Sequence, residues 1–230
     1  MVVRISHGAC KQCGKPVVYQ GAEYCSPACY GKAYGQTLCV LCRAAPVDLP
    51  DQVCRDCDMD PNEQKDALIS PCGAFRYVLT RIWAPPPWIL FIGLNPSTAD
   101  AQVDDPTVRW WRSYAKKKDF GGYLAVNLFA FRATDPKDLE ASGYLIGPDN
   151  DSAIAQAAEQ CELVIGCWGS SGGDPATERA LQLPLRKDRY VFSLGENTDG
   201  NPRHPMARGK NSISFEAQPL LWSSPEGGIL

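Results

Sequence analysis

The sequence contains no apolar run close to the roughly 20 residues that a membrane span needs. Its first ten residues also lack the apolar core of a signal peptide, so we expect a cytoplasmic protein without a membrane partner. Excess charge of one sign is missing too, because the net charge is −3 over 230 residues. This balance argues against a broad basic surface that binds nucleic acid by counterion release alone, although it leaves room for a local basic groove.

Cysteine is scarce in most of the chain but concentrated near its start. Of the eleven cysteines, eight lie between Cys10 and Cys57, and the other three are scattered later. Disulfides are not expected in the cytosol, where thiols stay reduced. The spacing instead repeats, since each half of the segment holds two close cysteine pairs separated by 11 residues. The eight residues are Cys10, Cys13, Cys25, Cys29, Cys39, Cys42, Cys54 and Cys57.

Two close pairs supply the four thiolates of a closed tetrahedral metal shell, which favours zinc or iron–sulfur chemistry. We therefore predict two structural Zn²⁺ ions in a double zinc-ribbon module over residues 1–60, each ion held by four of these cysteines. Consecutive ribbons and an interleaved pairing use the same residues, and the spacing does not choose between them. A segment of this size has little core, so metal binding is expected to supply its folding free energy.

Behind this module the composition changes to that of an ordinary globular domain. The segment Asp58–Lys65 is polar, contains Pro61 and is interpreted as a linker. Apolar segments then alternate with amphipathic ones, which predicts an α/β domain over residues 67–225 with a mostly parallel central sheet in a three-layer αβα arrangement. Strands are expected at 75–83, 88–93, 123–131, 163–168 and 190–194, and helices at 106–118, 150–161 and 175–183.

Polar clusters follow three of the predicted strands. They are Gly93-Leu-Asn-Pro-Ser-Thr-Ala-Asp100 with Asp104-Asp105, Asn127-Leu-Phe-Ala-Phe-Arg132, and Gly200-Asn-Pro-Arg-His204-Pro-Met-Ala-Arg208. In parallel sheets the binding site lies at the carboxyl ends of the strands, so these clusters are expected to meet.

These motifs carry a resemblance. The domain resembles an uncharacterised conserved family typified by GLNPSTAD and NLFAFRATDP (DUF1643-like). More distantly, the order of GLNP, a strand followed by Asn, and a late His-Pro loop is similar to the uracil-DNA glycosylase superfamily, in its mismatch-specific and thymine-DNA glycosylase branch. The resemblance implies a uracil-DNA glycosylase-like fold and a DNA substrate whose target nucleotide is flipped out of the duplex.

The resemblance also implies roles for single residues. Asn95 stands where these enzymes hold the attacking water, and Asn127 where they read the edge of the flipped base. His204 stands where a donor stabilises the departing base. Asp100 and Asp105 are further catalytic candidates, although both could be helix N-terminal charges. The remaining substrate-binding candidates are Gly93, Leu94, Pro96, Ser97, Thr98, Phe129, Arg132, Met206 and Arg208.

Two departures from the superfamily refine the expectation. Uracil-specific members carry a bulky Tyr after the catalytic motif, whereas the residues here, Pro96 to Ala99, are small. A pocket of this kind would admit a 5-substituted pyrimidine. Some members hold an iron–sulfur cluster inside the glycosylase domain, but this domain has three cysteines, which is one ligand short.

The sequence thus predicts a monomeric DNA glycosylase that excises a modified pyrimidine by hydrolysis and leaves an abasic site. Two alternatives stay open. One is a zinc-assisted, non-catalytic binder of modified or single-stranded nucleic acid, and the other is an enzyme that acts on free nucleotides or nucleobases.

Overall fold

The computed structural model describes residues 37–38, 46–47, 63–97, 99–133 and 136–222. The chain divides into two units, Met1–Asp60 and Pro61–Leu230. In the first unit the described residues are those of two short antiparallel strands, β1 (Thr37–Leu38) and β2 (Pro46–Val47). The predicted zinc-ribbon module and its eight cysteines lie outside the described residues.

The second unit is built on a seven-stranded sheet in the order β3-β4-β6-β5-β7-β8-β9. Its strands are β3 (Gln64–Ile69), β4 (Arg76–Ile82), β5 (Trp88–Gly93), β6 (Gly122–Asn127), β7 (Leu163–Gly166), β8 (Phe192–Ser193) and β9 (Leu220–Leu221). The four middle strands, β6-β5-β7-β8, are parallel, whereas the three pairs at the sides are antiparallel.

The sheet is therefore mixed, and the prediction of a mostly parallel sheet was wrong for its edges. The connection between β3 and β4 is a short turn, closed by hydrogen bonds between Ser70 and Phe75. A turn of this length can join only antiparallel strands. The segment 58–65 was interpreted as a linker, but Gln64 and Lys65 belong to β3.

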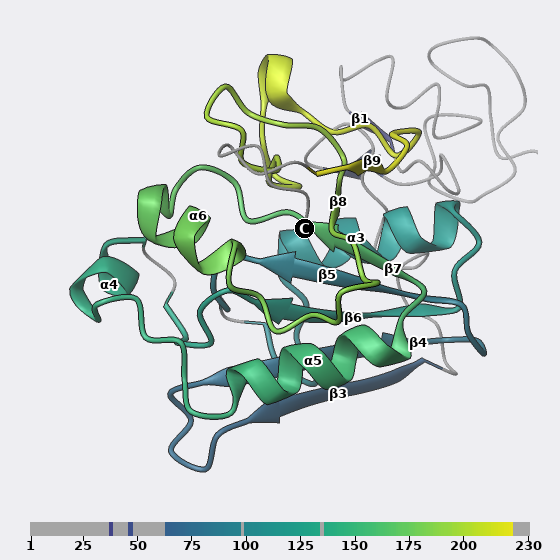
Figure 1. Cartoon of the computed structure of the whole chain (residues 1–230). Coiled ribbons are helices and arrows are strands. Elements are labelled where there is room, and N and C mark those ends of the chain that lie inside the picture. The colour runs from purple at the N-terminus through teal and green to yellow at the C-terminus, as the bar shows by residue number, and fades with distance from the viewer. Residues whose placement is uncertain (1–36, 39–45, 48–62, 98, 134–135, 223–230) are drawn as a thin grey trace, which may run out of the picture. The chain divides into compact units, whose positions relative to one another are not determined.

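Helices pack on both faces of this sheet. On one face α5 (Asn150–Gln160) contributes Ile154 to a core that includes Leu90 and Leu124, and Figure 1 shows this helix running roughly along the direction of the strands. On the other face α3 (Pro106–Lys117) stacks Trp111 on Phe91 with ring centroids 5.4 Å apart. Alternate strand residues point to opposite faces, and because helices cover both faces β5 is buried from Ile89 to Gly93. The other helices are α4 (Pro136–Ala141), α6 (Gly173–Ala180) and the 3₁₀ turn η1 (Gly209–Asn211).

The start of α3 follows from its sequence. Asp105 is the N-cap, and its carboxylate accepts a hydrogen bond of 2.9 Å from the backbone N–H of Val108. Pro106 occupies the first helical position, where its missing N–H costs nothing. This cap, which the Asp-Pro pair predicts, fixes the direction in which α3 leaves the loop after β5.

A buried network of charges ties this loop to the sheet. Asp104 accepts hydrogen bonds from Arg81 on β4 and from Arg112 on α3, each at 2.6 Å at the closest atoms. Glu63, just before β3, also accepts from Arg112, at 2.9 Å. Burial raises the pKa of Glu63, and Arg112 offsets only part of that rise. Burial also raises the pKa of Asp104, but Arg112 and Arg81 together outweigh it and hold this pKa below its ordinary value.

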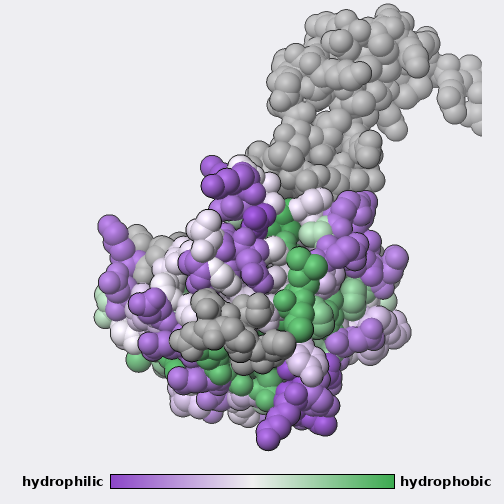
Figure 2. All heavy atoms as spheres, turned by 45° about the horizontal axis from the view of Figure 1, so that its top comes forward, coloured by the Kyte–Doolittle hydropathy of each residue, from purple (hydrophilic) through white to green (hydrophobic). Residues whose placement is uncertain are grey.

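The coloured part of the face that Figure 2 turns to the viewer is largely hydrophilic. Figure 2 shows hydrophobic residues as a narrow band among hydrophilic ones on the face turned to the viewer. Among the described helices, none combines the length and the apolar character that crossing a membrane would require.

Candidate functional site

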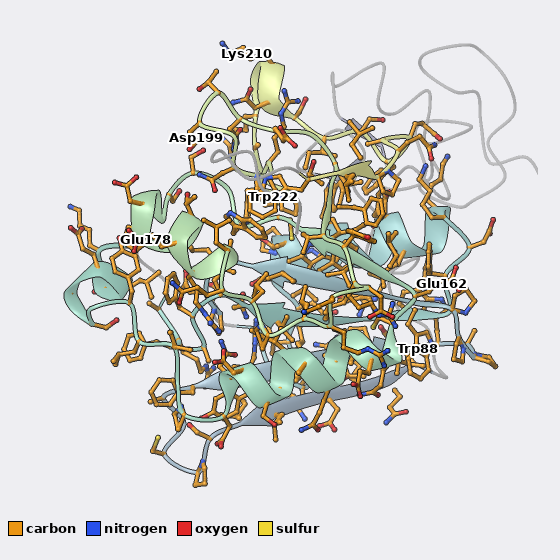
Figure 3. The ribbon with its side chains drawn as sticks, in the orientation of Figure 1. Trp88, Glu162, Glu178, Asp199, Lys210 and Trp222 are labelled. Carbon is orange, nitrogen blue, oxygen red and sulfur yellow. The ribbon has the colours of Figure 1, made fainter. Side chains whose placement is uncertain are left out.

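A cavity of about 750 Å³ opens at the carboxyl ends of β5, β6 and β7. The amino ends of β5 and β7 lie away from the cavity, and Figure 3 marks them by Trp88 and Glu162. Glu178 on α6 lies on the side of the domain opposite to these two residues. The residues that line the cavity are Arg76, Gly93, Leu94, Asn95, Ser97, Asp105, Pro106, Thr107, Trp111, Asn127, Ala133, Trp168, Gly169, Ser170, Ser171, Asn197, His204, Met206, Ala207 and Asn211.

All three loops that the sequence singled out reach this cavity. Asn95 comes from the loop after β5, Asn127 is the last residue of β6, and His204 comes from the late loop after β8. The late loop approaches the end of β7 closely, since the N–H of Gly169 donates to the carbonyl of Pro202 at 3.0 Å. A Cβ on Gly169 would lie 3.1 Å from the Cβ of His204, so a glycine here gives the histidine loop its room.

Asn95 is held by its amide nitrogen. Nδ2 donates to the carbonyl oxygens of Ala133 at 2.7 Å and Pro96 at 3.2 Å. Both amide hydrogens are thereby used, and Oδ1 has no partner among the described residues. The side chain is thus fixed in place with one acceptor to offer to a ligand or a water.

Asn127 is the most deeply buried amide of the cavity wall, with 2% of its surface exposed. Its Nδ2 has no hydrogen-bond partner among the described residues. A buried amide donor is costly to leave unpaired, so this N–H group is available to donate to a molecule that enters the cavity. Gly93 makes room for this side chain, because a Cβ there would lie only 2.7 Å from Asn127 Oδ1.

His204 is held in a defined protonation state. Its Nδ1 accepts a hydrogen bond of 3.1 Å from the backbone N–H of Met206, so in the neutral ring the proton is on Nε2. Burial lowers the pKa of His204 below its ordinary value, although Asp105 offsets part of this effect. At neutral pH the ring is therefore uncharged, and Nε2–H is its donor.

The cavity also contains a cation that the sequence reasoning missed. Arg76, the first residue of β4, is 2% exposed and lines the cavity wall. Burial lowers its pKa to about 10, partly offset by Asp105, so the side chain stays charged at neutral pH. The sequence did contain a signal for this residue, because arginine at the start of a buried strand is rare unless its charge has a partner.

Other lining residues were missed as well. The stretch from Trp168 to Ser171 follows β7 directly, just as the predicted clusters follow β5 and β6. Its small polar residues at a strand end were a usable signal. Trp111 on α3 packs on Phe91 and also reaches the cavity.

Several predicted site residues lie elsewhere. Asp100 closes its own loop by accepting from the backbone N–H groups of Gln102 and Val103, and these hydrogen bonds lower its pKa. Phe129 is buried in the core and packs on Tyr144. The others outside the cavity lining are Pro96, Arg132 and Arg208.

Their positions have physical reasons. Leu128 and Phe129 continue beyond β6 as buried chain, so Phe129 joins the core instead of the cavity. Arg132 donates to the carbonyl of Gly73 at 3.4 Å, and Arg208 is exposed next to η1. Thr98 lies outside the described residues. Gly93, Leu94, Asn95, Ser97, Asp105, Asn127, His204 and Met206 are the predicted residues that the structure brings together.

No cluster of three or more His, Cys, Asp or Glu that could hold a metal ion occurs in the described part of the chain. Residues 76–206 match a family model described as a protein of unknown function (DUF1643). Neither a curated protein nor a solved structure matches the chain.

Proposed function

Since the chain belongs to the DUF1643 family, for which no function is described, we propose its activity from the cavity itself. We propose that the protein is a DNA glycosylase that binds a flipped, modified pyrimidine nucleotide and hydrolyses its N-glycosidic bond. The proposal includes the uracil-DNA glycosylase-like, three-layer form of the α/β fold. It also includes a zinc-ribbon module on residues 1–60 that assists DNA binding.

The observation that carries the proposal is the convergence of Asn95, Asn127 and His204 on one cavity. These residues come from one strand end and two loops far apart in the sequence, and each offers a different hydrogen-bonding group. An acceptor, an unpaired amide and a neutral N–H donor are the groups that base excision requires at the sugar, the base edge and the leaving base.

In this mechanism Asn95 Oδ1 accepts a hydrogen bond from the water that attacks the sugar carbon. As the bond from that carbon to the base nitrogen breaks, its electron pair goes to the base, which leaves as an anion. His204 Nε2–H donates to a carbonyl oxygen of the base and stabilises this charge. The water loses its proton to solvent, and the sugar keeps the hydroxyl.

Asn127 gives the cavity its preference for a base. Its amide carries one donor and one acceptor, so it can pair with the edge of a pyrimidine. Ser97 leaves space at the cavity wall where a bulky residue would exclude a substituent on the ring. We therefore propose that the substrate base is a 5-substituted pyrimidine.

The test is a screen of the full chain against duplex and single-stranded DNA that carries different modified pyrimidines. Alkali-sensitive abasic sites are the readout. With the base that is excised, Asn95→Ala and His204→Ala should each lose about 100-fold or more in single-turnover rate while still binding the DNA. Gln218→Ala, which removes an amide outside the cavity lining, should leave the rate unchanged. Specific binding of a modified base without cleavage would favour the non-catalytic alternative.

One observation favours an enzyme that acts on free nucleotides as the second candidate. Among the described residues that line the cavity, Arg76 is the only lysine or arginine. A groove that follows a DNA backbone commonly presents several cations to successive phosphates. Release of base from a free nucleotide, with none from DNA, would select this candidate.

A further inference from the structure

Four arginines of the described domain are almost completely buried: Arg76, Arg81, Arg112 and Arg179. A buried cation is strongly unfavourable unless an anion compensates it. Three of the four have one, because Arg81 and Arg112 pair with Asp104 and Arg179 pairs with Asp151. Arg76 makes no ion pair with any described residue.

Arg76 is held by one corner of its guanidinium group. Nη1 donates to the carbonyl oxygen of Ala99 at 2.6 Å. Nε is buried without a hydrogen-bond partner, and Nη2 has none among the described residues. The edge formed by Nε and Nη2 is one of the two-pronged faces with which arginine binds a carboxylate or a phosphate.

The surroundings show that the neighbouring carboxylate does not fill this edge. Asp105 acts on Arg76 through space, but it forms neither a hydrogen bond nor an ion pair with it, and it caps α3 instead. Both residues line the same cavity. The cavity wall thus holds a charged guanidinium group whose Nη1 is hydrogen-bonded and whose Nε and Nη2 edge has no partner among the described residues.

We propose that Arg76 forms an oxyanion subsite in the cavity, and that the substrate carries a phosphate or carboxylate which binds the Nε and Nη2 edge. This inference deepens the proposed function and rests on the cavity being the substrate site. The anion has two chemical sources, the phosphate of the bound nucleotide and an acidic substituent on its base.

The experiment measures binding by the full chain at about pH 8, where the phosphate is doubly charged and His204 is neutral. Inorganic phosphate is the first probe. Thymidine is then compared with thymidine 5′-monophosphate, and uracil with 5-carboxyuracil. At least one charged ligand should bind about 10- to 100-fold more tightly than its uncharged counterpart, as expected for a charge-assisted pair. The pair that shows the preference identifies the source of the anion.

Variants separate this subsite from a structural role. Arg76→Met should abolish the preference, whereas Arg76→Lys should retain part of it. Arg189→Met is the matched control, because Arg189 donates to the carbonyl of Glu162 before β7, at the end away from the cavity. Asp105→Asn keeps a residue able to cap α3 but removes a nearby negative charge, so it should tighten phosphate binding about threefold.

A thermal melt without ligand accompanies each variant. Because an unpaired buried charge is removed, Arg76→Met should melt no lower than the wild type, and phosphate should no longer raise its melting temperature. If Arg76→Met does not fold, Asp105→Asn still decides the question. Equal binding of charged and uncharged ligands to the wild type, or weaker phosphate binding by Asp105→Asn, would overturn the subsite. Anion preference without base excision would instead count only against the glycosylase.

Discussion

Replacement of Gly93 by alanine tests how closely the cavity wall is fitted. The added Cβ would lie 2.7 Å from Asn127 Oδ1, whereas ordinary contact begins at 3.4 Å. The amide must therefore move by about 0.7 Å, which is the difference between these two distances. A misplacement of about 1 Å at a reacting centre costs on the order of 100-fold in rate.

We expect Gly93→Ala to lower single-turnover excision by about 30- to 100-fold and to reduce discrimination between bases. The crowded side chain should cost about 1–3 kcal/mol of stability, measured by urea unfolding. Asn95 and His204 are untouched, so the loss would belong to the misplaced Asn127 amide.

Gly143→Ala is the matched control. Gly143 has a positive φ of 72°, and a Cβ there meets nothing within 4 Å. The strained backbone should cost about 1–2 kcal/mol, so stability falls by a similar amount without any contact to the cavity. An unchanged single-turnover excision rate in Gly93→Ala would refute the reasoning that Gly93 positions Asn127. An equal loss of excision rate in Gly143→Ala would refute it as well.

Four further predictions follow from the structure and the sequence. Burial lowers the pKa of His204 in the folded chain below its ordinary value of 6.5. Below that pH the histidine is protonated more readily in the unfolded chain than in the folded one, so the free energy of unfolding should fall as the pH drops through 6.5. Urea unfolding at about pH 7.5 and 5.5 should show a smaller loss in His204→Asn than in the wild type, and an equal loss would contradict it. Asp104→Asn breaks the buried network and should cost about 3–5 kcal/mol in the same assay, whereas Glu216→Gln at the surface should change nothing measurable. Ser97→Tyr should reduce excision of 5-substituted pyrimidines more than excision of uracil, and equal loss would show that Ser97 does not face the substituent. Elemental analysis should find about two zinc ions per chain, Cys25→Ser should unfold the N-terminal module alone, and fewer than about one zinc would defeat the metal prediction.

Much of the central fold was predictable because its signals are local. The apolar run from Trp88 to Gly93 forms β5 with those bounds, and the Asp105-Pro106 pair starts α3. The strand expected at 123–131 ends at Asn127 instead, and beyond it the backbone N–H groups of Leu128 and Phe129 bond to the carbonyls of Gly93 and Leu94. Strands β3 and β9 were missed because their pairing is non-local and their alternation is short.

The residues of the candidate site were predictable where they stand at the ends of parallel strands, and were missed or misplaced elsewhere. Asn95, Asn127 and His204 follow strands, and the parallel order of those strands brings them to one end of the sheet. Arg76 is the first residue of β4, which pairs with β6 in the antiparallel direction, so no rule about the ends of parallel strands could place it in the cavity. Arg132 and Arg208 were assigned by motif position, whereas their exposure and orientation depend on turns that the sequence pattern does not specify.

The most direct test of the proposed function is the product of a single turnover. The wild-type chain is mixed with DNA that carries one modified pyrimidine, and mass spectrometry measures the free base and the abasic strand. The proposal predicts that both appear together in equal amounts for at least one base, and that His204→Ala forms them about 100-fold more slowly. Absence of free base across the panel, or its release at an unchanged rate by His204→Ala, would contradict the proposed mechanism.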